Sequence, residues 1–384
     1  MSSFGRTGSP SCRWSLQGSL AVLAYTYVGY PLLITVAARL ARGRSSRRAA
    51  PATVEADLTV VIAAWNEEQI IAAKIDDTRR QEYGPGRLHI IVVADGSSDR
   101  TADIAREKGV QVLHEARRRG KTSAVNRGIA ASRSEFVCLT DANCFLAPAA
   151  LQGLTAPFFD ERVAVVSGVK SVTGPGVRGR GEGLYWRLET ATKVAESVFG
   201  AVMGAPGELC GLRRAMTRPI PQGIVNDDYH LTCDALARSL VVRVAPGAIA
   251  YEQVSPRTLD EFERRTRIAA GTWQTTLGHL TLADPRRGWV ALAFISHRVL
   301  RSVLAPALLP ALLVQTFRCC SVDRLARLLL IAQASAWVAA LAGVVTDSPA
   351  AAVPFQFALT NLATLRGGAR YLTGRQPAAW RVVR

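Results

Sequence analysis

The sequence lacks the motifs by which several protein classes are recognised. Its seven cysteines are odd in number and include no Cys-x-x-Cys pair, so free thiols are expected rather than a disulfide framework or a zinc site. No zinc-finger spacing, RNP-like aromatic stretch or basic-region heptad accompanies the net charge of +17, which argues against nucleic acid as a partner. The basic excess then indicates an anionic membrane surface or anionic substrates.

Long runs without charge lie near both ends of the 384-residue chain, which is 49% hydrophobic. Residues 16–38 are long enough to span a bilayer, and arginines dominate the stretch at 39–48. The positive-inside rule therefore predicts an N-terminus outside and a following domain in the cytoplasm. A signal peptide is the alternative, but the run is long and has no clear small-residue cleavage site.

The C-terminal region carries three further apolar runs. Residues 328–345 are a good candidate span, and residues 351–365 are borderline in length. Residues 305–317 are short and contain two prolines, so we expect a re-entrant or interfacial segment followed by a hairpin of the last two runs. If 305–317 crosses fully, the arginines at 318–327 and in the tail violate the positive-inside rule.

Residues 57–285 have the pattern of a soluble α/β domain. Buried strands are predicted at 58–64, 88–94, 110–113 and 134–140, and helices at 67–80, 98–109, 121–132 and 229–238. This alternation predicts a doubly wound, mostly parallel sheet. Such sheets bind ligands at the carboxyl ends of their strands.

Polar side chains follow two of these predicted strands. Asp141 and Asn143 end the fourth strand, and a carboxylate and an amide oxygen at this spacing suit Mg²⁺ or Mn²⁺, which in turn binds a diphosphate. Asp95 and Gly96 end the second strand, where a carboxylate can bond a nucleobase edge and glycine permits close approach of the backbone. Turns and helix caps are the alternative for both pairs.

The stretch Arg117-Arg118-Arg119-Gly120-Lys121 precedes a predicted helix. Basic side chains at a helix N-terminus oppose the helix dipole, so their placement indicates a function such as phosphate binding. A solvated loop is the alternative for the three arginines, and Lys121 is the stronger candidate.

Four motifs in chain order resemble those of inverting family 2 glycosyltransferases of the GT-A type, in particular membrane-anchored bacterial polysaccharide synthases: Trp65-Asn66-Glu67, Asp95-Gly96-Ser97, Gly120-Lys121 with Asn126, and Asp141-Ala142-Asn143. The resemblance implies a nucleotide-sugar-binding half at 51–165 and an acceptor and catalytic half at 166–285. It also implies a membrane anchor with a basic linker at 1–50 and an interfacial and transmembrane region at 286–384.

The same resemblance implies roles for single residues. The nucleotide sugar would be bound by Asn66, Glu67, Asp95, Gly96, Lys121, Asn126 and Asp141, with Asp95 on uracil. Asp141 and Asn143 would hold Mg²⁺ or Mn²⁺ and the diphosphate. Because the family's metal motif ends in aspartate, the neutral amide of Asn143 is expected to bind the cation less tightly.

Two segments of the second half resemble the family's acceptor side. Residues 207–214, with Gly211, resemble its glycine-rich acceptor segment, and residues 224–230 resemble its acidic catalytic motif. By this match Asp228 is the base that takes the acceptor's proton, with Asp227 as second candidate. A desolvated carboxylate beside a like charge has the raised pKa that a base needs. A helix N-cap at Asn226 or Asp227 is the alternative and is compatible with catalysis.

Residues 263–271 partly resemble the Gln-x-x-Arg-Trp motif of polysaccharide synthases. Arg267 matches the arginine that neutralises the departing diphosphate, whereas Arg264 replaces the glutamine and Ile268 the tryptophan. The acceptor and diphosphate candidates are therefore Gly211, Arg264, Arg265 and Arg267. Losing the tryptophan removes a stacking platform and weakens the case for processive synthesis. Trp273 either substitutes for it or packs in the core.

Together these assignments predict a multi-pass inner-membrane enzyme of a bacterium with a cytoplasmic catalytic domain. It would move a hexosyl or N-acetylhexosaminyl group from a nucleotide sugar, with UDP as the nucleotide, to a growing cell-surface polysaccharide or glycolipid. One alternative is a single addition to a polyprenyl-phosphate or other lipid acceptor. Another is an inactive nucleotide-sugar-binding scaffold, which Asn143 favours. Other envelope-biosynthesis proteins are candidate partners, and His297 is expected to be structural.

Overall fold

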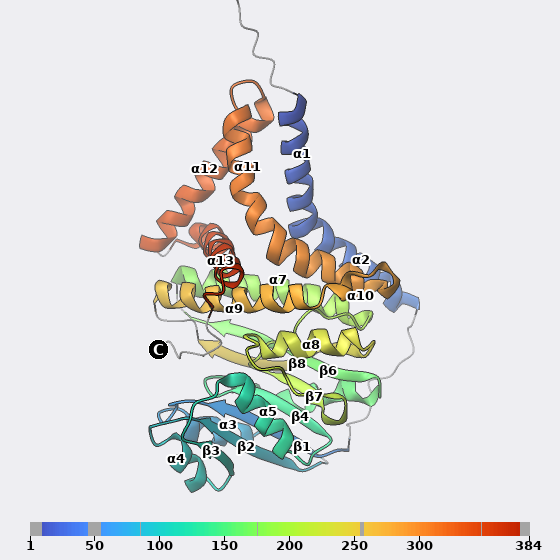
Figure 1. The fold of residues 1–384 in the computed structure, drawn as a ribbon, viewed down its shortest axis with the longest axis vertical. Coiled ribbons are helices and arrows are strands. Elements are labelled where there is room, and N and C mark those ends of the chain that lie inside the picture. The colour runs from blue at the N-terminus through green and yellow to red at the C-terminus, as the bar shows by residue number, and fades with distance from the viewer. Residues whose placement is uncertain are drawn as a thin grey trace, which may run out of the picture.

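The computed structural model describes residues 10–44, 55–84, 86–174, 176–253, 257–346 and 348–376. The predicted basic linker after residue 44, with Arg47 and Arg48, and the tail arginines Arg381 and Arg384 lie outside the described residues. Figure 1 shows the α/β part at one end, two long helices across it, and the apolar helices at the other end.

Within the described residues one eight-stranded sheet has the order β3-β2-β1-β4-β7-β6-β8-β5. Strands β1 to β4 pair in parallel, whereas β7 runs antiparallel to β4 and β6. Every residue of β1 is buried, which explains its uninterrupted apolar sequence. The predicted mostly parallel α/β fold is confirmed. The strands are β1 (Leu58–Ala64), β2 (Leu88–Asp95), β3 (Gln111–Glu115), β4 (Phe136–Asp141), β5 (Phe145–Leu146), β6 (Val163–Thr173), β7 (Cys210–Arg213) and β8 (Val241–Gln253).

Short helices connect these strands. The helix expected at 67–80 begins at Ile71, because residues 68–70 form a turn after β1. The helix expected at 229–238 begins at Asp227, with Asn226 as its N-cap residue. The short helices are α3 (Ile71–Arg79), α4 (Thr101–Glu107), α5 (Lys121–Ala131), α6 (Ala150–Thr155) and α8 (Asp227–Ala237), with 3₁₀ helices at Ala156–Phe159, Arg214–Met216, Leu280–Ala283 and Pro285–Arg287.

Three long helices form the layer between the sheet and the apolar helices. They are α7 (Gly176–Val198), α9 (Thr258–Gly278) and α13 (Pro349–Leu372), and α13 packs against both others. Glycine makes the contact between α13 and α9 close: a Cβ on Gly367 would lie 2.6 Å from the Thr266 carbonyl oxygen. A Cβ on Gly368 would meet the ring of Trp273 at the same distance. Trp273 is therefore a packing residue.

Three helices are long and apolar enough to cross a membrane in the part of the chain that is described: Trp14–Arg42, Trp289–Cys319 and Arg324–Val345. The first combines α1 (Pro10–Ala24), the π-helix η1 (Tyr25–Gly29) and α2 (Tyr30–Arg44). The second combines α10 (Trp289–Ala293), the π-helix η6 (Phe294–Leu304) and α11 (Ala305–Cys319), and the third is α12 (Arg324–Val345). They agree with an association with the membrane.

This arrangement corrects three expectations. Residues 305–317 are not a short re-entrant segment, since they continue the helix that starts at Trp289. Residues 351–365 are not among the candidate spans of the described residues, and α13 packs on α7 and α9 as well as on α12. Figure 1 places the turn between α11 and α12 far from the sheet, so its arginines oppose the positive-inside rule.

Cys319, near this turn, is disulfide-bonded. Among the side chains described, Cys138, Cys144, Cys210, Cys233 and Cys320 are free thiols as expected.

Candidate active site

A cavity of about 1240 Å³ lies where the end of β4 meets the N-termini of α5 and α8 and one face of α9. The structure brings most of the predicted site residues to its wall: Glu67, Lys121, Asp141, Asn143, Asp227, Asp228, Arg264, Arg265 and Arg267. The wall does not include Asn66, Asp95, Gly96, Asn126 or Gly211. Asp141 and Asp228 therefore share one site, as expected, and Asp95 does not reach it.

An ion pair connects α5 to the end of β4. Lys121 begins α5 directly after Gly120, and its Nζ lies 2.6 Å from Asp141 Oδ1. Burial alone would lower the pKa of Lys121, but the charges of Asp141, Asp227 and Asp228 raise it. Burial raises the pKa of Asp141, and Lys121 counteracts this shift. The Asp141 carboxylate thus depends on a cation next to it for its charge.

The oxygen atoms at the end of β4 fit the predicted divalent cation. Asn143 donates through Nδ2 to Glu252 Oε1 at 3.2 Å, and its Oδ1 meets only the weakly donating thiol of Cys144 at 3.6 Å. The described residues include no cluster of three or more His, Cys, Asp or Glu side chains able to hold a metal. One carboxylate and one amide oxygen are nevertheless a typical protein contribution to a Mg²⁺ site that substrate phosphates complete.

The candidate base lies at the start of α8, where negative charge is favourable to the helix dipole. Asn226 fixes this end of the helix, because its Nδ2 donates to the Ile268 carbonyl of α9 at 2.8 Å. Burial and the neighbouring charge of Asp227 raise the pKa of Asp228 to about 7. Asn226 occupies the N-cap position without a side-chain capping bond, and Asp228 lines the cavity, so the role of Asp228 as the base stays a prediction.

The three candidate arginines of α9 differ in what they contact. Arg264 and Arg265 each pair with Glu182 and Glu261. Arg267 makes no hydrogen bond or ion pair with any residue that the structure describes, although it lines the cavity. Burial, and next the charge of Arg264, lower its pKa. A guanidinium that is partly buried without an anion is available to an anionic ligand.

Asp95 organises the loop before α5. Its carboxylate accepts from the Gly120 amide at 2.6 Å and pairs with Arg127 at 3.1 Å, and it is 2% exposed. Gly96 has a φ of +69°, and a Cβ there would lie 2.6 Å from the Arg118 backbone, so only glycine fits. A contact between Asp95 and uracil stays a prediction, for which this loop would have to move.

The other predicted residues away from the cavity also have structural contacts. Asn66, at φ 55°, accepts from the Ser98 amide at 2.9 Å and links the loops after β1 and β2. Asn126 makes two hydrogen bonds with the backbone of Ile220, at 2.8 and 2.9 Å. Gly211 lies inside β7, where a Cβ would meet Leu154 at 3.1 Å. Their assignment to ligand contacts stays a prediction.

Sequence reasoning missed a buried charge network beside Asn143. Lys170, in the middle of β6, pairs with Glu208 at 2.5 Å and with Glu252, and all three line the cavity. Burial opposes ionisation of Glu208, but Lys170 lowers its pKa to about 2. A lone lysine within the apolar run of β6 was the available signal, because lysine is rarely buried unless it is paired.

The substitution Lys170→Met is expected to destabilise the fold. The Lys170 side chain is 1% exposed, and its loss leaves the buried Glu208 carboxylate without its ion-pair partner and Glu252 with only the 3.7 Å pair to Arg264. The free energy of unfolding should therefore fall by about 3–5 kcal/mol. Denaturation of the purified protein in detergent measures this change. Lys108→Met is the control, because the Lys108–Asp76 pair is partly exposed and little loss is expected. Equal losses in both variants would contradict the assignment.

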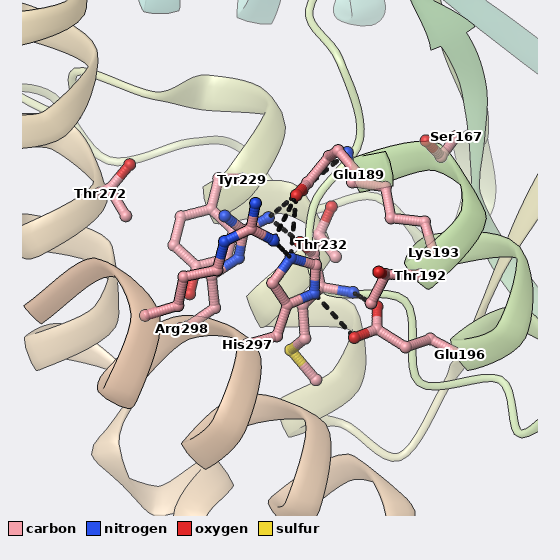
Figure 2. Close-up of polar contacts among 12 residues, drawn as sticks. Ser167, Glu189, Thr192, Lys193, Glu196, Tyr229, Thr232, Thr272, His297 and Arg298 are labelled. Carbon is pink, nitrogen blue, oxygen red and sulfur yellow. Dashed lines mark hydrogen bonds and ion pairs between the residues drawn. The ribbon is translucent and has the colours of Figure 1, made fainter. Parts of the chain in front are cut away.

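A second buried network joins η6 to α7 and α8. His297 of η6 contacts Glu196 through Nδ1 at 2.7 Å and Glu189 through Nε2 at 3.1 Å (Figure 2). The guanidinium of Arg298 lies 4.7 Å from the ring centre of Tyr229, the residue after Asp228. Both ring nitrogens of His297 are thus occupied, in agreement with a structural role.

Comparison with known proteins agrees with this geometry. Residues 59–219 match Glycosyl transferase family 2. Over 242 residues, 58% of this chain and 57% of the relative, the sequence is 26% identical to the probable glycosyltransferase YdaM of Bacillus subtilis. Over 284 residues, 68% and 59% of the two chains, it is 23% identical to the beta-monoglucosyldiacylglycerol synthase of Trichormus variabilis.

The overall fold is similar to that of the mannosyltransferase PcManGT from Pyrobaculum calidifontis, solved in complex with GDP-Man and Mn²⁺. The likeness covers 94% of this chain and 99% of that one, with a TM-score of 0.73 at 20% identity. Residues 59–219 therefore correspond to glycosyltransferase family 2, and the fold of the chain is of the GT-A type. It spans less than two thirds of the length of the two curated relatives named above.

Proposed function

We propose that this chain is an inverting glycosyltransferase of the bacterial inner membrane. It moves a hexosyl or N-acetylhexosaminyl group from a nucleotide sugar, with UDP as the nucleotide, to a cell-surface polysaccharide or glycolipid. One observation carries the proposal: a carboxylate with a pKa of about 7 shares a cavity with the Lys121–Asp141 pair and the unpaired Arg267. A base and cations for a leaving diphosphate are the two requirements of this reaction.

The reaction is a single displacement. The acceptor hydroxyl attacks the anomeric carbon of the donor and gives its proton to Asp228. The bond from that carbon to the diphosphate breaks, and the diphosphate leaves with the electron pair. Arg267 and Lys121 neutralise the departing charge. Asp141 and Asn143 would hold a Mg²⁺ or Mn²⁺ ion, which would supply further charge neutralisation at the diphosphate.

A donor screen tests this proposal. We expect the detergent-solubilised protein to release nucleoside diphosphate from one of UDP-glucose, UDP-N-acetylglucosamine and GDP-mannose in the presence of a membrane extract. Removal of divalent cations with EDTA should slow the release by about 10²-fold or more, because a metal ion contributes several kcal/mol to this step, and Mn²⁺ should restore it. Nucleotide binding without turnover of any donor would instead support the inactive scaffold.

The pH dependence follows from Asp228. Its pKa is raised to about 7, so below this pH the carboxylate is protonated and cannot accept the acceptor's proton. The transfer rate at saturating donor should therefore fall about tenfold per pH unit below pH 7 and level off above it. Initial rates between about pH 5 and pH 8, with the unfolding temperature followed in parallel, measure this profile. A flat profile in a stably folded protein would exclude Asp228 as the base.

A further inference from the structure

One part of the cavity is lined by apolar side chains that no described residue covers. Leu32 of α2, Leu188 of α7 and Val353 and Phe357 of α13 line it, and they are 60%, 61%, 54% and 41% exposed. Clusters of exposed apolar side chains of this kind mark interaction sites. Because Leu32 belongs to the candidate span Trp14–Arg42, this mouth of the cavity lies at the hydrocarbon boundary.

The helices around this mouth are held together by specific contacts. Tyr27 of η1 donates its hydroxyl hydrogen to Asn361 Oδ1 at 2.9 Å, and its ring meets Phe357 edge-on with centroids 5.3 Å apart. α7 packs against both α2 and α13 and presents Leu184 and Leu188, one helical turn apart, to the cavity. The apolar mouth is therefore formed by three helices, which Figure 1 shows on the side of the sheet that faces the apolar helices.

The cavity wall carries charged and aromatic side chains as well as the apolar mouth. Behind the apolar mouth, Tyr185 lies between the guanidinium groups of Arg265 and Arg301, at 5.8 and 5.6 Å from its ring centre. Arg267 and Asp228 follow in the same cavity. An amphipathic molecule matches this wall. Its hydrocarbon part would lie against the apolar mouth, and its polar group would lie near Asp228.

The residues near Asp228 restrict the chemistry of the polar group that the cavity can accept. Asp227 and Asp228 are adjacent carboxylates, which repel a phosphate dianion and accept a proton from a hydroxyl. Ile268, which lines the cavity and is 38% exposed, provides no aromatic face on which a continuous glycan chain would stack.

We infer that the acceptor is a hydroxyl-bearing glycerolipid of the membrane, whose headgroup reaches Asp228 through this cavity while its hydrocarbon tail lies against Leu32 and Leu188. This inference rests on the proposed function. The headgroup hydroxyl loses its proton to Asp228 and bonds to the anomeric carbon, and the nucleoside diphosphate leaves with the electron pair. A lipid acceptor then never has to leave the bilayer.

The test compares two matched leucine variants of the full chain. Leu188→Asn changes the apolar mouth, whereas Leu259→Asn changes an exposed leucine of α9 that does not line the cavity. Each protein receives radiolabelled donor and phosphatidylglycerol vesicles that carry diacylglycerol, glucosyldiacylglycerol or polyprenyl phosphate. Label in the organic phase measures transfer to lipid, and nucleotide affinity is measured separately with UDP.

We expect label in diacylglycerol or glucosyldiacylglycerol. Leu188→Asn should raise the KM for that lipid about tenfold, as expected for the loss of an apolar contact worth 1–3 kcal/mol, with UDP affinity unchanged and Leu259→Asn like the wild type. Turnover that labels only water-soluble product, or only polyprenyl phosphate, would overturn the inference and leave the proposed function intact. A wild-type protein without turnover of any donor would overturn both.

Discussion

The Asp228→Asn protein is expected to bind nucleotide sugar normally and to transfer sugar about 10²- to 10⁴-fold more slowly than the wild type. The amide has nearly the shape of the carboxylate but cannot accept the proton of the acceptor hydroxyl. Asp228 Oδ1 accepts from the Tyr229 amide at 2.6 Å, and the amide oxygen of asparagine can keep this bond. Isothermal titration with UDP and single-turnover kinetics with labelled donor separate binding from chemistry.

Asp234→Asn is the matched control for this experiment. Asp234 lies on the same helix, pairs with Arg238 at 2.8 Å and does not line the cavity. We expect this variant to keep the wild-type transfer rate. If Asp228→Asn transfers sugar at the wild-type rate, Asp228 is not the base, and Asp227 becomes the carboxylate to test.

The Arg267→Ala protein is expected to lose about 10²- to 10³-fold in kcat, the cost of removing one donor from the site of developing charge. Arg267 makes no hydrogen bond or ion pair with another described residue, so the loss is expected in the transition state and not from a broken internal network. The KM for the donor should change less than kcat. Arg267→Lys should recover part of the rate, because it restores the charge without the planar guanidinium.

Arg366→Ala controls for the loss of one arginine on the same side of the molecule. Arg366 is half-exposed, pairs with Glu263 of α9 at 2.8 Å and does not line the cavity. Its removal should leave kcat unchanged. A similar decrease in both variants would mean that Arg267 acts through general charge or stability, and its role at the diphosphate would be excluded.

The first four strands could be predicted from local sequence to within about two residues at each end. β1 was predicted with its observed bounds, because seven consecutive buried residues leave no polar position to confuse the pattern. Asp141 was found for a similar reason, as the end of a predicted strand, whereas Asp228 was found by the resemblance of residues 224–230 to the family's acidic motif. Each directly follows or begins a regular element, and such positions are set by local periodicity and capping.

The contacts of Asp95 and Asn126 could not be predicted in the same way. Both occur in motifs typical of a donor site, yet in this structure Asp95 bonds the loop at Gly120 and Asn126 bonds Ile220. Their partners lie 25 and 94 residues away in sequence. The sequence also did not show that residues 305–317 continue a longer helix, because a helix can continue through a proline when neighbouring helices pack against it.

The sequence by itself determined the alternation of strands and helices, the family resemblance and the choice of Asp141, Asp228 and Arg267 as candidate site residues. Each of these depends on residue type and near neighbours in sequence. Only the tertiary structure decided which charges are paired. Lys170 meets Glu208 and Glu252 across the sheet, and Arg267 stays unpaired while Arg264 does not. Ion pairs and cavities form between segments distant in sequence, and no local pattern records which of them meet.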